Sequence, residues 1–152
     1  MSLTRRVARP MMAAMFVAGG WDSFNNPDPK APTAAPVISR LAGPLNLPDD
    51  PATLVKVNGA VQVGAGALLA VGKLPRLSAL ALAGTLVPTT FAGHRFWEVE
   101  DAQARKGQRI HFLKNVSMLG GLILAATDTE GRPSLSGRAR QAAKRAGRAL
   151  PG

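Results

Sequence analysis

The chain has 152 residues, of which 46% are hydrophobic and 18% charged, and its formal net charge is +10. It has no cysteine, which excludes thiol–disulfide chemistry by the chain itself and thiolate-ligated metals or clusters. In a soluble protein such a charge suggests nucleic-acid binding, but here the basic residues flank apolar stretches, which favours a membrane protein without a nucleic-acid partner.

Four apolar stretches, each about as long as a bilayer is thick, organise the chain. They cover approximately residues 7–24, 52–72, 74–92 and 110–127. A helix rises about 1.5 Å per residue, so roughly 20 residues cross the hydrocarbon core of a membrane. We therefore predict an all-α fold, a four-helix transmembrane bundle over residues 1–131, followed by a basic cytoplasmic tail over residues 132–152.

The first stretch has the features of a start-transfer segment. Arg5, Arg6 and Arg9 precede it, and Pro10 stands where the first turn of a helix tolerates proline. The alternative is a cleaved signal peptide, but only a weak small-residue cleavage site precedes Trp21. We predict a retained helix.

The connection after the first stretch is rich in Pro, Asn and Asp. Within it Val37, Ile38 and Leu41 recur at helical spacing, between Pro36 and Pro44. A segment of this length is too short to span a membrane. We predict a short interfacial helix in this first outer loop.

Charge is divided between the two sides of the predicted bundle. The segment before the first stretch, the turn at Lys73 and Arg76 and the tail are basic, whereas nearly all acidic residues lie on the other connections. By the positive-inside rule this indicates an N-in, C-in orientation for a multi-pass protein of the bacterial plasma membrane, with the lipid bilayer around it. Pro88 predicts a kink near the outer end of the third helix.

Polar residues inside the stretches are expensive in lipid and therefore mark candidate functional positions. They fall at the outer ends of the second and fourth helices, where two helix N-termini add partial positive charge. We predict that they line a polar pocket for an anionic or quinone-like ligand. The residues are Lys56, Asn58, Gln62, His111, Lys114 and Asn115.

Two simpler interpretations of the lysines stay open. The two lysines can pair with acids such as Asp22 and Glu98, or extend to the outer headgroups. His94 and Glu98, four residues apart, with His111 beyond them, form a poor metal pattern, and we predict no metal site. Small residues such as Ala60 and Gly64 are expected to allow close helix packing.

Several segments together carry a family resemblance. They are Arg9-Pro10 followed by MMAAMFVAGG, NNP at 25–27, VKVNGAVQVGAGALLAVGKLPR, HRFWEVED and HFLKNVSMLGGLILAATDTEGRPSL. These segments resemble DoxX-family membrane proteins of actinobacteria. The resemblance implies a four-helix integral protein of the bacterial plasma membrane. The family takes its name from a subunit of a thiosulfate:quinone oxidoreductase, and other members are linked to redox and thiol-stress complexes. The resemblance assigns no catalytic residue to this chain.

These observations lead to a functional hypothesis with two rivals. The hypothesis is a membrane subunit or scaffold of a complex associated with redox or oxidative stress, whose partner is a soluble oxidoreductase or another membrane subunit. The first rival is a quinone-dependent oxidoreductase acting on a small sulfur anion, with quinone as its cofactor, so whether the chain is an enzyme stays open. The second rival is a small-solute transporter.

Overall fold

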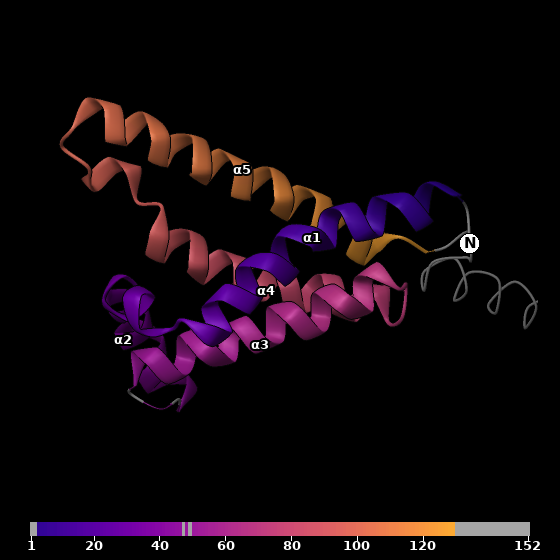
Figure 1. Cartoon of the computed structure of the whole chain (residues 1–152), viewed down its shortest axis with the longest axis horizontal. Coiled ribbons are helices and arrows are strands. Elements are labelled where there is room, and N and C mark those ends of the chain that lie inside the picture. The colour runs from indigo at the N-terminus through magenta and orange to yellow at the C-terminus, as the bar shows by residue number, and fades with distance from the viewer. Residues whose placement is uncertain (1–2, 47, 49, 130–152) are drawn as a thin grey trace, which may run out of the picture.

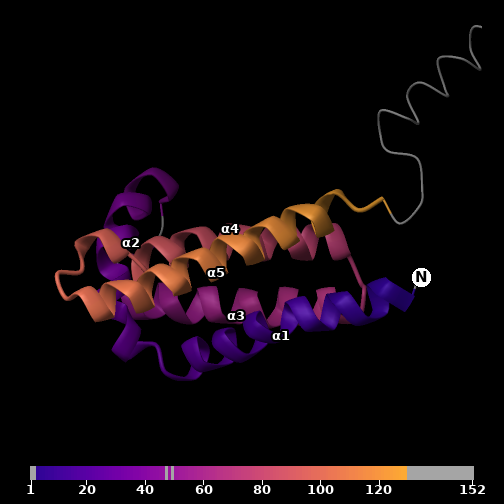
Figure 2. The same ribbon diagram turned by 90° about the horizontal axis from the view of Figure 1, so that it is seen from above.

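The computed structural model describes residues 3–46, 48 and 50–129, and within them it contains five α-helices, two short 3-10 turns and no strand. The all-α prediction is therefore confirmed, whereas the predicted tail at 132–152 lies outside the described residues. Four long helices run side by side, with the shorter α2 attached at one end (Figures 1 and 2). The elements are α1 (Leu3–Asn25), η1 (Asp28–Lys30), α2 (Ala31–Leu45), α3 (Pro51–Ala70), α4 (Pro75–Gly93), η2 (Phe96–Glu98) and α5 (Ala102–Thr127).

The helices are longer than the apolar stretches at two places. Helix α1 begins at Leu3 rather than at residue 7, so Pro10 is its eighth residue and lies inside the helix rather than in its first turn. Helix α5 begins at Ala102 rather than at residue 110, because Asp101 caps it by accepting a hydrogen bond from the Ala104 backbone N–H at 2.6 Å. Hydropathy missed both extensions, since the added residues are polar but include good helix formers such as Arg, Lys and Gln.

Helix α2 is also longer than its apolar core suggests. The turn η1 leads directly into it, so the helix begins at Ala31 and ends at Leu45. The sequence had suggested that Pro36 and Pro44 bound this helix, but both lie inside it. Helix α2 packs against α3 and α4.

Helix α1 runs antiparallel to α3 and packs closely along it through glycine. A Cβ atom added at Gly59 would lie 2.6 Å from the carbonyl oxygen of Gly20, which is closer than side chains tolerate. Gly64, in contrast, has no atom within 4 Å of such a Cβ. The prediction that Ala60 and Gly64 mediate helix packing was therefore wrong within this chain, because they point away from α1.

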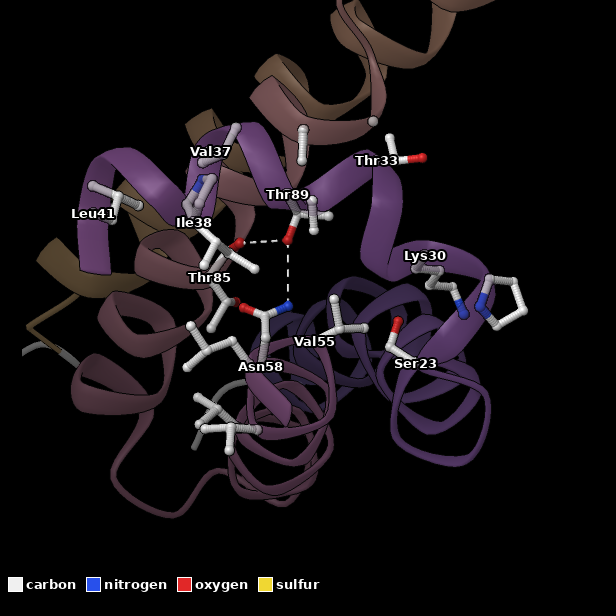
Figure 3. A pocket seen from close by; sticks show the side chains of 18 residues that line it. Ser23, Lys30, Thr33, Val37, Ile38, Leu41, Val55, Asn58, Thr85 and Thr89 are labelled. Atoms are coloured by element: carbon white, nitrogen blue, oxygen red, sulfur yellow. Dashed lines mark hydrogen bonds between the residues drawn. The ribbon is translucent and has the colours of Figure 1, made fainter. Parts of the chain in front are cut away.

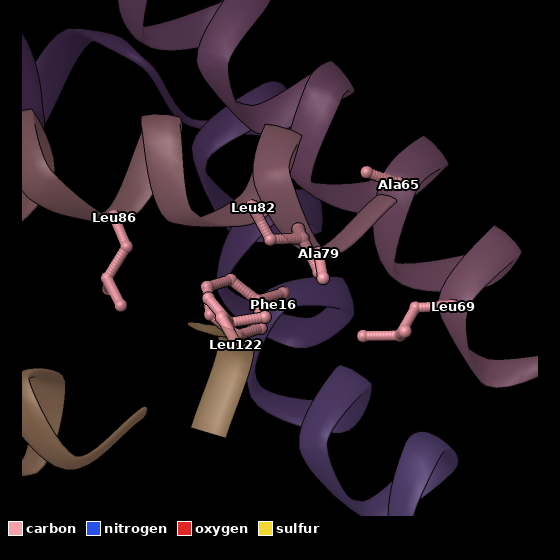
Figure 4. Packing of buried hydrophobic residues seen from close by; sticks show 7 residues of the cluster. All are labelled: Phe16, Ala65, Leu69, Ala79, Leu82, Leu86 and Leu122. Carbon is pink, nitrogen blue, oxygen red and sulfur yellow. The ribbon is translucent and has the colours of Figure 1, made fainter. Parts of the chain in front are cut away.

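The buried apolar core draws on α1, α3, α4 and α5 (Figure 4). It contains Phe16, Ala65, Leu69, Ala79, Leu82, Leu86 and Leu122. Outside this core, large apolar side chains are exposed, for example Leu3, Val7, Met11 and Met15, which recur every four residues along α1. An apolar exterior of this kind suits lipid as the surrounding solvent. By length and composition, α3 and α5 can each cross a membrane.

The two ends of the bundle differ in charge. At the end where α1 begins and α3 turns into α4 lie Arg5, Arg6, Arg9, Lys73 and Arg76, and we call it the basic end. At the opposite end α1 and α4 finish and α3 and α5 begin. We call this the acidic end, because it holds six of the seven acidic residues that the structure describes, alongside basic residues such as Lys30 and Arg95. The six are Asp22, Asp28, Asp50, Glu98, Glu100 and Asp101.

Asp50 fixes the start of α3 at the acidic end. Its carboxylate accepts hydrogen bonds from the backbone N–H groups of Ala52 and Thr53, at 3.3 and 3.0 Å. Hydrogen bonds from the side chain and backbone of Thr53 hold the pKa of Asp50 below its ordinary value. An ionised cap also suits the partial positive charge of a helix N-terminus.

Candidate functional site

A cavity of about 530 Å³ lies between α2, α3 and α4 in the half of the bundle nearer the acidic end (Figure 3). Helix α2 covers it because its apolar residues turn toward α3 and α4. Most of the lining is aliphatic. Representative lining residues are Val37, Ile38 and Leu41 of α2 and Leu54, Val55 and Val61 of α3.

A short chain of hydrogen bonds forms the polar part of this lining. The Asn58 amide donates from Nδ2 to Oγ1 of Thr89 at 3.3 Å (Figure 3). Thr89 in turn donates its hydroxyl to the backbone oxygen of Thr85 at 2.7 Å. Thr85 likewise donates to the backbone oxygen of Leu82 at 2.9 Å, so both hydroxyl protons are used within α4.

A charged pair stands at one edge of the cavity. Lys30, which lines it, forms a salt bridge with Asp22 of α1, with 2.5 Å between Nζ and Oδ2. Asp22 also accepts a hydrogen bond from the Asn26 side chain at 3.0 Å. The charge of Lys30 is therefore balanced within the protein before any ligand arrives.

Asn115 of α5 makes a second amide–hydroxyl contact with α4. It is 7% exposed and donates from Nδ2 to Oγ1 of Thr90 at 3.0 Å. Thr90 is equally buried and donates its hydroxyl to the backbone oxygen of Leu86 at 2.7 Å. Two adjacent threonines, Thr89 and Thr90, thus connect α4 to α3 on one side and to α5 on the other.

The other four residues of the predicted pocket have separate partners or none. Gln62 is buried, and its Cβ packs against Gly20 of α1. Lys56 is exposed, with Nζ 5.2 Å from the centroid of the Phe24 ring, a cation–π geometry. Lys114 is exposed on α5, and within the described residues neither lysine forms a salt bridge.

His111 of α5 stacks on His94, the residue that follows α4, at the acidic end. The two imidazole centroids lie 5.2 Å apart with an interplanar angle of 23°. Nδ1 of His94 lies 2.7 Å from Oε1 of Gln108. In the described part of the chain no three His, Asp or Glu side chains gather as metal ligands. A separate set of rings from α4, η2 and α5 packs edge to face or tilted, namely Phe91, Phe96, Trp97 and Phe112.

The sequence did not single out Asp128, which organises the basic end. Its carboxylate accepts two hydrogen bonds from Arg5, at 2.7 Å from Nε and 2.9 Å from Nη2. Nη2 of the buried Arg9 lies 3.7 Å from the same carboxylate, and Arg76 donates to the Asp128 backbone oxygen at 2.8 Å. An acidic residue directly after an apolar stretch, on the side otherwise occupied by arginines, was the available signal.

Thr89 and Thr90 are the other residues that sequence reasoning missed. The available signal was a polar Thr85-x-x-x-Thr89-Thr90 pattern in an otherwise apolar helix. A threonine hydroxyl inside a helix usually donates to a carbonyl oxygen of the preceding turn, so the pattern alone does not predict a contact with another helix.

Comparison with known proteins identifies the family. A family model described as DoxX matches residues 5–95, which run from α1 to just beyond the end of α4. No curated protein and no solved structure matches the chain. Because the family model covers more than half of the 152 residues, the chain belongs to the DoxX family of membrane proteins.

Proposed function

We propose that this protein is a multi-pass integral protein of the bacterial plasma membrane and serves as the membrane subunit or scaffold of a redox-associated complex. In this proposal α1, α3, α4 and α5 all cross the bilayer, the basic end faces the cytoplasm and the acidic end faces outward. The redox association rests on the family, whose namesake is a subunit of a thiosulfate:quinone oxidoreductase.

The observation that carries the membrane part of the proposal is the uneven number of Lys and Arg residues at the two ends of four antiparallel helices. Five lie at the basic end and six more follow α5 in the sequence, against six at the acidic end outside the apolar stretches, namely Lys30, Arg40, Arg95, Arg105, Lys106 and Arg109. Basic residues accumulate on the cytoplasmic side of membrane proteins. The apolar side chains exposed between the ends supply the lipid-facing surface.

Polar side chains that join one helix to another support a scaffold. Asn58 and Asn115 each bond to a threonine of α4, so these amides join one helix to another. In membranes such contacts between helices stabilise a defined arrangement, because lipid offers polar groups no alternative partner. A rigid bundle of this kind can hold a redox partner at a fixed position on the membrane.

Labelling of single cysteines tests the orientation. The chain has no cysteine, so Asp28→Cys and Lys73→Cys each introduce one thiol, both at exposed positions and at opposite ends of the bundle. A membrane-impermeant maleimide should label Asp28→Cys in intact cells and Lys73→Cys only after lysis. The reverse pattern would overturn the orientation, and labelling of both in intact cells would overturn the four-span arrangement.

A second experiment separates a scaffold from an enzyme. The purified protein alone should not reduce a quinone with thiosulfate as donor, and activity should require a soluble oxidoreductase that co-purifies with it. Reduction by the protein alone would instead establish the rival function, a quinone-dependent oxidoreductase.

A further inference from the structure

We infer that the cavity between α2, α3 and α4 binds an uncharged lipophilic molecule that carries a carbonyl or hydroxyl group, and that Asn58 forms the hydrogen bond to this group. The inference rests on the membrane location in the proposed function, but it does not depend on a redox partner. It differs from the expectation from the sequence in two respects, because Asn58 rather than the lysines binds the head group and the ligand is not an anion.

The size and lining of the cavity indicate a lipophilic body. Its volume of about 530 Å³ lies within the range of roughly 300–1,000 Å³ that is typical of small-molecule sites. Helices α2 and α3 supply mostly branched aliphatic side chains, such as Val37, Ile38 and Val55. A ligand that enters this space from lipid gains stability mainly through close van der Waals contacts with the lining, since no apolar surface leaves water.

The polar lining provides hydrogen-bonding capacity for one small group. Asn58 uses one N–H on Thr89, which leaves a second N–H and the amide oxygen without a partner among the described residues. An amide can therefore donate to a ligand carbonyl or accept from a ligand hydroxyl. Thr89 holds the amide in place, because its own proton is already directed to the backbone oxygen of Thr85.

The charges around the cavity argue against an ionic ligand. Lys30 is the ionisable residue of the lining, and Asp22 already neutralises it. An anion in the cavity would lose its hydration and meet no free positive charge in return, which is costly in an apolar site. An uncharged head group avoids this cost.

The exposed part of the lining shows from where such a molecule arrives. Leu41, Val57 and Val61 line the cavity, yet they remain 40%, 52% and 39% exposed. The opening next to them is therefore apolar and meets lipid when α3 spans the membrane. A lipophile dissolved in the bilayer can reach the cavity there without crossing water.

Photolabelling of the full-length protein in phosphatidylcholine vesicles tests the inference. The probe is hexadecanol with a diazirine on its chain, and the label should map by mass spectrometry to cavity-lining residues of α2, α3 and α4. Hexadecyl sulfate, which has the same chain but a strongly acidic head group and so stays an anion in the bilayer, should compete at least tenfold more weakly than hexadecanol. Equal competition by hexadecyl sulfate, or labelling confined to the outer surface of α5, would overturn the inference.

Two substitutions on α3 provide a matched pair for the hydrogen bond. Asn58→Leu should weaken hexadecanol binding about tenfold, as the loss of one hydrogen bond predicts. Gln62→Leu removes another amide of the same helix, one that packs against α1 rather than lining the cavity, and should leave binding unchanged. Equal effects of the two would overturn the role of Asn58.

A substitution that fills the cavity provides an independent test, because it leaves Asn58 and its hydrogen bond unchanged. Ala34 of α2 lines the cavity, so Ala34→Trp should abolish labelling of the lining while the variant still elutes as a folded protein in detergent. Undiminished labelling of this folded variant would contradict the site.

Two probes with the same head group distinguish the sources of the ligand. Hexadecanol represents acyl-chain lipids and farnesol represents isoprenoid lipids. Stronger competition by either one supports the site and identifies the type of hydrocarbon chain that it binds. Failure of both to compete would overturn the inference. Because no partner protein is present, this result is separate from the cysteine-labelling and co-purification tests of the proposed function.

Discussion

Thr89 and Thr90 are adjacent in sequence, yet their hydroxyls face different neighbouring helices. Successive residues of a helix point about 100° apart, so two adjacent hydroxyls can face different neighbours. Thr89 meets Asn58 of α3 near the surface, whereas Thr90 meets Asn115 of α5 in the interior. Each threonine gives its proton to its own helix and accepts a proton of an asparagine, so both threonine hydroxyls have a donor and an acceptor partner.

We expect the buried pair to contribute more to stability than the exposed pair. In a double-mutant cycle, Asn115→Leu and Thr90→Val should show a coupling free energy of about 1 kcal/mol, typical of hydrogen bonds between membrane helices. Asn58→Leu and Thr89→Val should show less, because that bond is longer, 3.3 Å against 3.0 Å, and more exposed. Reversible unfolding in mixed detergent micelles measures both cycles. A coupling of zero for Asn115 and Thr90 would show that their contact does not form.

At the scale of elements, glycine determines how closely α1 approaches α3. Gly20 and Gly59 bring the two backbones together, and Gly66 accommodates Val17 of α1, whose Cγ2 would lie 2.8 Å from an added Cβ. Small residues allow such approach in membranes, where packing rather than water drives helix association. The phase of α3 decides which of its glycines take part, since Gly64 points outward.

A matched pair of substitutions tests this contact. Gly59→Ala should destabilise the protein by about 1–3 kcal/mol, because the new methyl group meets backbone atoms of Gly20 and Phe24 that cannot move aside independently. Gly64→Ala places the same group in open space on the same helix and should be neutral, or stabilising by up to about 1 kcal/mol through helix propensity. Thermal unfolding in detergent distinguishes the two. A similar loss for both variants would mean that helix packing is not the cause.

At the scale of the whole molecule, the bundle is closed near its basic end. Helix α1 packs on α3, α3 on α4, and α4 on α5. The first and last of these helices meet through Arg5 and Asp128, and Met12 lies beside Gly121. Arg76 adds α4 to the same carboxyl-terminal turn of α5. Asp128 thus joins three helices that are far apart in sequence.

Removal of Asp128 should therefore loosen the whole bundle. We expect Asp128→Ala to cost about 2 kcal/mol or more, since it removes hydrogen bonds to a charged group and leaves the buried Arg9 without this carboxylate. Glu98→Ala is the control, because the pair of Glu98 with Arg95 is local and Glu98 is exposed, so its loss should cost less than about 1 kcal/mol. Unfolding free energies in detergent provide the comparison, and equal costs would contradict the role of Asp128.

The sequence by itself determined the helical class, the approximate position of each long helix and the division of charge between the ends. These features are local, because apolar length and the charge of flanking residues can be read without knowing any contact. It also identified Asn58 and Asn115 as polar residues inside apolar stretches, where contact with lipid is unfavourable. The sequence predicted the first residues of α1 and α5 less accurately, since polar helix formers and the Asp101 cap extend a helix beyond its apolar part.

Only the tertiary structure decided which of these polar residues meet. Contacts between helices depend on the rotation of each helix about its axis and on the place of α2, and neither is a local property of the chain. For this reason the lysines expected in one pocket have separate surroundings, whereas Thr89, Thr90 and Asp128 hold the helices together. The cavity beside Asn58 likewise exists only because α2 folds back over α3 and α4.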